Sequence, residues 1–85
     1  MQINKGKASR EAVQRLINDM TDFSEVVKYK LQLMMNETSR LGETWRDPQY
    51  QQFNTFMTEL TESLKRDLGV FDDAASALQK KVDMY

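Results

Sequence analysis

The side chains that most often carry acid–base or metal chemistry are missing from this sequence. Its 85 residues include no histidine and no cysteine. Histidine is the commonest general base and metal ligand, and cysteine supplies nucleophilic or metal-binding thiolates and disulfides. Their absence excludes sites built on them, including the Glu-x-x-His pairs of di-iron helical bundles. The sequence also has no glycine-rich phosphate-binding loop.

Carboxylates are the remaining candidates for catalysis, and Asp72 and Asp73 are the only two that are adjacent. Neighbouring residues in a helix point about 100° apart, so these carboxylates do not converge on one substrate. We therefore interpret the pair as part of a solvated helix face. We expect the protein to be no enzyme and to hold no metal or cofactor.

Basic residues gather near the N-terminus at Lys5, Lys7, Arg10 and Arg15, with Glu11 among them. This is a weak signal for nucleic acid or an anionic membrane, and a plain solubilising end is the better explanation. The formal net charge of the chain is −1, with both signs mixed. No uncharged run approaches the roughly 20 apolar residues of a membrane helix, and no apolar signal-peptide core follows the N-terminal charges. We expect neither nucleic-acid binding nor stable membrane insertion.

The spacing of apolar residues predicts an all-α protein. The sequence has only one proline and three glycines, fewer turn-forming residues than a protein rich in strands and tight turns needs. Two series of residues instead repeat every seven positions, as in helices that pack along their length. The first predicts a helix over about residues 8–41 and consists of Val13, Met20, Val27, Met34 and Leu41. The second predicts a helix over about residues 48–84 and consists of Met57, Leu64, Phe71, Leu78 and Tyr85.

More apolar residues flank both series than one partner helix can cover. Beside the first series lie Leu16, Ile17, Phe23, Leu31, Thr38, Val26, Leu33 and Met35. Beside the second lie Phe53, Leu60, Leu68, Ala75, Val82, Phe56 and Val70. A stripe wider than about 100° requires a third or fourth helix. We therefore predict that residues 1–85 form one antiparallel two-helix hairpin that dimerises into a four-helix bundle, with itself or with a similar hairpin. The predicted hairpin and dimer core is Val13, Met20, Phe23, Val27, Met34, Leu41, Met57, Leu60, Leu64, Leu68, Phe71 and Leu78.

The segment between the predicted helices has the residues that end one helix and start another. Gly42 is expected to end the first helix in the left-handed conformation. Asp47 followed by Pro48 predicts an N-cap and a first helical residue. Because the connection is so short, it folds the second helix back along the first. Ser9 is expected to start the first helix, while Gly69 marks a close helix approach, a slight bend or a tolerated weakness.

An aromatic cluster surrounds this turn. Trp45 lies in the connection, and Tyr50, Phe53 and Phe56 follow at three-residue spacing on one side of the second helix. Two interpretations are compatible with the spacing. The cluster seals the open end of the bundle as a small core, or it forms a partly exposed hydrophobic groove that recognises a partner.

A helical hairpin with tryptophan at its turn and a large apolar residue eight positions later resembles the WXG family of small type VII secretion proteins. Here the pair is Trp45 and Phe53, and the second helix continues with Leu60, Leu64, Leu68 and Phe71. Asp47 stands where the family motif has glycine, giving Trp45-Arg46-Asp47, and an N-capping aspartate serves the same helix start.

The resemblance implies a dimeric four-helix bundle that acts as a small secreted substrate, or as an adaptor or chaperone for a larger one. Its implied partners include a secretion ATPase or a larger effector. The resemblance assigns partner recognition at the turn to Trp45, Asp47, Tyr50 and Phe53. A cytoplasmic structural or adaptor bundle unrelated to secretion is the alternative function.

The resemblance also implies export without a cleavable signal peptide, and the alternative is a cytoplasmic location. Many members, or their partners, carry a Tyr-x-x-x-Asp/Glu export signal. In this sequence Tyr29 is followed four positions on by Leu33, and Tyr50 by Asn54. Export would therefore depend on a partner that supplies the signal.

Overall fold

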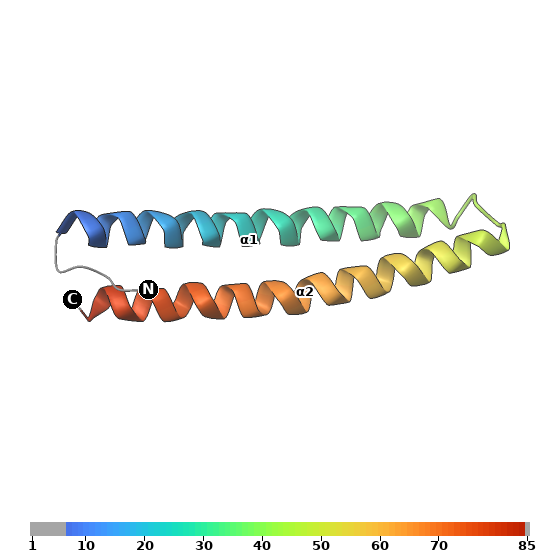
Figure 1. Ribbon diagram of the computed structural model, residues 1–85. Helices are drawn as coiled ribbons and strands as arrows, with labels where there is room; N and C mark the ends of the chain where they lie inside the picture. Colours follow the sequence, from blue (N-terminus) through green and yellow to red (C-terminus); the bar gives the residue numbers. More distant parts are fainter. Residues whose placement is uncertain (1–6, 85) are drawn as a thin grey trace.

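The structure, a computed structural model, describes residues 7–84 as two long helices joined by a short turn (Figure 1). α1 spans Lys7–Leu41 and α2 spans Pro48–Asp83. The helices run antiparallel and lie side by side, so the hairpin is a rod of 61 × 15 × 13 Å. The all-α hairpin predicted from the seven-residue spacing is confirmed, and each predicted helix boundary lies within one residue of the observed one.

The start of α2 has the cap that the sequence predicts. The Asp47 carboxylate accepts a hydrogen bond from the backbone N–H of Gln49 at 2.9 Å. Pro48 is the first helical residue, where its missing N–H leaves no donor unsatisfied. This junction depends only on neighbouring residues, which is why the sequence alone predicts it.

Two other helix ends differ from the predictions. α1 begins at Lys7, so Ser9 lies inside the helix and is not its N-cap; lysine and alanine are good helix formers and extend the first turn backwards. Gly42 does not adopt the left-handed conformation, since no glycine of the described chain has a positive φ. Its N–H instead donates to the carbonyls of Thr38 at 3.3 Å and Ser39 at 3.2 Å.

The buried seam between the helices is one narrow line on each. On α1 it consists of Ile17, Ser24, Leu31 and Thr38, and on α2 of Met57, Thr61, Leu68, Ala75 and Val82. Several of these residues are small or polar, and no large side chain within residues 7–84 is completely buried. Small side chains bury little apolar area, so the seam supplies limited hydrophobic stabilisation. The hairpin therefore has a thin core.

The predicted core residues lie mostly beside this seam. Met57 and Leu68 are buried within it. The half-buried residues are Val13, Met20, Val27, Leu64, Phe71 and Leu78. The exposed residues are Phe23, Met34, Leu41 and Leu60. A seven-residue repeat identifies lines that run along a helix, but neighbouring lines share the repeat, so the repeat alone does not identify the line that faces the other helix.

Gly69 does not mark a close helix approach. It is exposed on α2, and a Cβ atom added there would meet no atom within 4 Å. That interpretation of the glycine is therefore wrong. The helix accommodates Gly69 without any packing requirement for it.

Candidate interaction surfaces

The seam divides the hairpin into two long faces of different chemistry. Positions three residues after a seam residue, or one residue before it, lie on one side of each helix. The rings of Phe23 on α1 and Phe71 on α2 meet on that side, with centroids 5.6 Å apart in an edge-to-face arrangement. We call this side the apolar face. Its large apolar residues are Val13, Leu16, Met20, Phe23, Val27, Met34, Leu41, Phe53, Phe56, Leu60, Leu64, Phe71 and Leu78. The same spacing places the charged residues Lys30, Glu37, Asp67 and Lys81 on this side.

Large side chains on the apolar face are left substantially exposed. Phe23 is 56% exposed, Leu16 and Met34 are each 44% exposed, and Leu60 is 39% exposed. Each such side chain forgoes much of the roughly 1.5–3 kcal/mol that full burial would contribute. Towards the turn the face is hollowed by about 380 Å³, lined by Met34, Glu37, Thr38, Leu41, Phe53 and Met57. The apolar face therefore exposes large side chains on both helices and has a hollow near the turn that a partner could fill.

The opposite side, which we call the polar face, carries cross-links between the helices. Gln14 and Gln79 exchange two amide hydrogen bonds, of 2.8 and 2.9 Å. The Lys28 ammonium donates to the Asp72 carboxylate at 2.7 Å. This hydrogen bond holds the pKa of the Asp72 carboxyl below its ordinary value. Two pairs of polar side chains on this face, Gln14 with Gln79 and Lys28 with Asp72, thus link the helices.

The aromatic residues at the turn pack together. The centroid of the Trp45 ring lies 5.6 Å from that of Tyr50, with 62° between the ring planes. It lies 6.0 Å from the centroid of the Phe53 ring. The Tyr50 hydroxyl donates to the backbone carbonyl of Thr38 at 2.9 Å and so joins the start of α2 to the end of α1. Trp45 and Tyr50 are half-buried. The cluster closes the turn end of the hairpin and still leaves part of each ring accessible.

The other turn residues singled out in the sequence are placed differently. Asp47 is exposed, and the hydrogen bond that it accepts is that of the α2 N-cap. Phe56 is 59% exposed and lies away from the paired rings of the cluster. The structure therefore brings together Trp45, Tyr50 and Phe53, with Asp47 beside them in the chain.

Gly42 matters at the turn for a reason that the sequence does not reveal. A Cβ atom at this position would lie 2.5 Å from the Tyr50 hydroxyl oxygen and 2.6 Å from the adjacent ring carbon. Any larger residue would displace the Tyr50 ring and the hydrogen bond that it makes to Thr38. Glycine is thus favoured here by the close approach of Tyr50 from α2 to the turn, and not by its backbone angles.

Within residues 7–84, no three carboxylates gather to hold a metal ion, and neither helix is both long and apolar enough to cross a membrane. Two sequence features fall outside the described residues. These are Lys5 of the basic cluster and Tyr85 of the second seven-residue series.

The sequence matches no protein-family model, and no curated protein or solved structure is significantly similar to it. A functional assignment therefore has to follow from the surfaces of the chain itself.

Proposed function

We propose that this chain is a non-enzymatic protein–protein interaction module that works as a dimer through its apolar face. The observation that supports this proposal is the contrast between the two faces. One leaves large apolar side chains such as Phe23 and Leu60 exposed, and the other is polar and cross-linked. Contiguous exposed apolar surface of this kind marks interaction sites.

The simplest partner for the apolar face is a second copy of the chain. A face of 61 × 15 Å offers roughly 900 Å² of projected area, against about 800 Å² per partner in stable complexes. Two such faces, related by a two-fold axis, would form a four-helix bundle and complete the thin core of each hairpin. A similar hairpin from another gene would fit the same face.

The turn is the second part of the proposed module. Its half-buried Trp45 and Tyr50 are of the residue types that anchor interfaces. The resemblance to WXG proteins rests on Trp45 and Phe53, and it extends the proposal to a secretion-linked substrate, adaptor or chaperone. Such a module would bind a secretion ATPase or a larger effector and would take its export signal from a partner.

Sedimentation equilibrium of the purified chain tests the dimer. The monomer has a mass of 10.0 kDa, and we expect twice this mass at micromolar concentration. A folded monomer that persists at these concentrations contradicts the homodimer. If that monomer instead pairs with a hairpin of similar length that co-purifies with it, the proposed dimer is a heterodimer.

Trp45→Ala tests the role of the turn. We expect dimerisation to persist, because Trp45 lies outside the apolar face, and we expect weaker capture of the native partner. A truncated interface anchor typically costs about 2 kcal/mol, or about thirtyfold in affinity. Tyr29→Ala is the control, since Tyr29 is an exposed aromatic of α1 that lies outside both the turn and the apolar face. If Trp45→Ala unfolds the chain, judged by circular dichroism, the cluster is only a core cap.

A further inference from the structure

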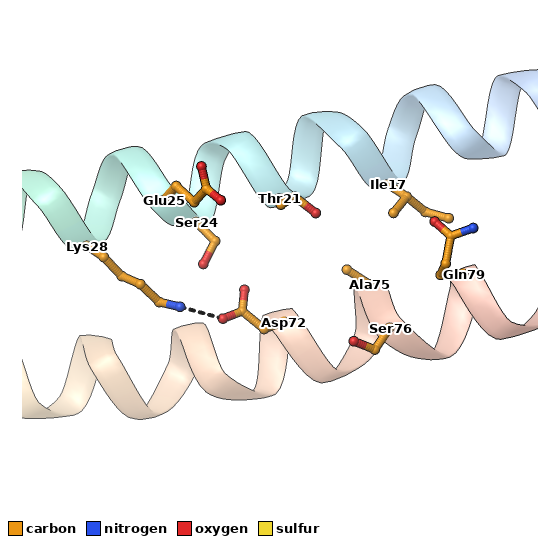
Figure 2. Close-up of a pocket in the computed structure, with 9 residues that line it drawn as sticks. All are labelled: Ile17, Thr21, Ser24, Glu25, Lys28, Asp72, Ala75, Ser76 and Gln79. Carbon is orange, nitrogen blue, oxygen red and sulfur yellow. Dashed lines mark hydrogen bonds and ion pairs between the residues drawn. The ribbon is translucent and has the colours of Figure 1, made fainter.

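The polar face contains a groove between α1 and α2, near the middle of the hairpin (Figure 2). It has a volume of about 360 Å³ and exists because the seam residues at this level, Ser24 and Ala75, are small. It is lined by Ile17, Thr21, Ser24, Glu25, Lys28, Asp72, Ala75, Ser76 and Gln79. Apart from Ile17 and Ala75, every one of these side chains is polar or charged.

Ser24 is the unusual residue of this groove. Its side chain is 2% exposed, and its hydroxyl oxygen has no hydrogen-bond partner within the described chain. Buried hydroxyls without a partner are rare, and a serine hydroxyl has one proton to donate and two lone pairs to accept with. The Ser24 and Asp72 side chains point towards each other across the groove (Figure 2). Because the Ser24 hydroxyl has no hydrogen-bond partner among residues 7–84, its lone pairs are available to an incoming donor.

The charged groups beside Ser24 favour a cation. Lys28 binds one oxygen of Asp72, and the second oxygen of that carboxylate points towards α1 and Ser24 (Figure 2). Glu25 lies at the rim of the groove and adds a second negative charge. With Lys28 counted, the charged residues that line the groove sum to −1, so the groove disfavours anions.

We propose that this groove binds the guanidinium group of an arginine side chain presented by a partner protein. A guanidinium is planar, carries five N–H donors and is more weakly hydrated than an ammonium ion, so it enters a narrow slot lined by acceptors. Its donors would bond to the Ser24 oxygen and the second Asp72 oxygen, and Glu25 would pair with its outer edge. The groove lies on the face opposite to the proposed dimer interface, so the inference does not depend on dimerisation.

The test is a titration of the isotope-labelled full chain with capped arginine amide, followed by amide chemical shifts. We expect saturable shifts centred on Ser24 and Asp72, with a dissociation constant of about 1 mM for so small a probe. Capped lysine amide should bind several-fold more weakly. Free arginine should also bind more weakly, because Glu25 and Asp72 repel its carboxylate. Equal binding of the capped lysine and arginine amides contradicts the assignment of a guanidinium ligand. Tighter binding of free arginine contradicts the proposal that the arginine belongs to a partner protein.

Matched variants separate the groove from general charge attraction. Ser24→Ala removes one acceptor and keeps a good helix former, and it should weaken binding about tenfold. Asp72→Asn should weaken binding at least as much. Asp73→Asn, which neutralises an adjacent carboxylate outside the groove, should leave binding unchanged. If Ser24→Ala binds like the natural chain, or if the two asparagine variants behave alike, the groove holds only water.

Discussion

The apolar and polar faces of this hairpin share one seam, yet they are separated by single steps in the sequence. Met20 and Val27 flank the seam on one side, while the residues that follow them, Thr21 and Lys28, flank it on the other. A one-residue shift changes the direction of a helical side chain by about 100°. The comparison teaches that the sequence specifies two surfaces of different chemistry, and that a stripe of apolar residues is not automatically the hairpin's own core.

The two faces also differ in what they contribute to the fold. Exposed ion pairs such as Lys28–Asp72 add little stability, but the paired amides of Gln14 and Gln79 favour one alignment of the helices. The apolar face leaves several large hydrophobic side chains exposed, among them Phe23 and Leu60. Because the seam is thin, we expect association through the apolar face to stabilise the fold by mass action.

The largest effect is expected from substitutions on the apolar face, which should weaken the proposed dimer. The double variant Phe23→Gln and Leu60→Gln places polar groups on both helices of the proposed interface. At about 2 kcal/mol for each side chain, dimer affinity should fall by at least about a thousandfold. The matched pair Thr21→Gln and Glu62→Gln lies across the seam on exposed positions and should dimerise normally. Sedimentation equilibrium distinguishes them, and equal behaviour of the two pairs contradicts the assignment of faces.

The next effect concerns the seam that both faces share. Leu31→Ala removes a buried side chain, 5% exposed, and should lower the free energy of unfolding by about 3 kcal/mol. Leu33→Ala, at a half-buried position two residues away, should cost clearly less. Chemical denaturation at one fixed protein concentration measures both. A larger loss at Leu33 would mean that the seam lies on a different line of α1.

A smaller, opposite effect is expected at Gly69, on the polar side of α2. Gly69→Ala should raise the free energy of unfolding by about 1 kcal/mol, because alanine has the higher helix propensity and its methyl group enters open space. Gly42→Ala is the contrasting control, since its methyl group would collide with Tyr50 and should destabilise the chain. Thermal unfolding compares the two, and a destabilised Gly69→Ala would reveal a contact on the polar side.

The smallest effect concerns the ion pair of the polar face. The folded pKa of Asp72 is lowered, so its pairing with Lys28 stabilises the fold above the unfolded pKa and is lost as pH falls through the folded pKa. Asp72→Asn should therefore lower the thermal midpoint slightly at neutral pH, relative to Asp73→Asn. The difference should vanish in acid. A difference that persists in acid would show that the asparagine substitution acts through packing.

The sequence by itself determined the two helices, the short turn and the capped start of α2. Each of these depends on residues within one or two turns of one another, as Asp47, Pro48 and Gln49 illustrate. Likewise, the Trp45 cluster could be anticipated, since Tyr50 and Phe53 follow within a few residues. Its role in recognition remains a proposal.

Only the tertiary structure decided which residues face each other. The seven-residue repeat is shared by neighbouring lines on a helix, and the opposite helix selects one of them. That selection buried Ser24 and Thr61, which the apolar pattern did not single out, and left Phe23 exposed. It also brought Tyr50 against Gly42 across the turn. Such contacts join different segments of the chain, so no local pattern in any one segment contains them.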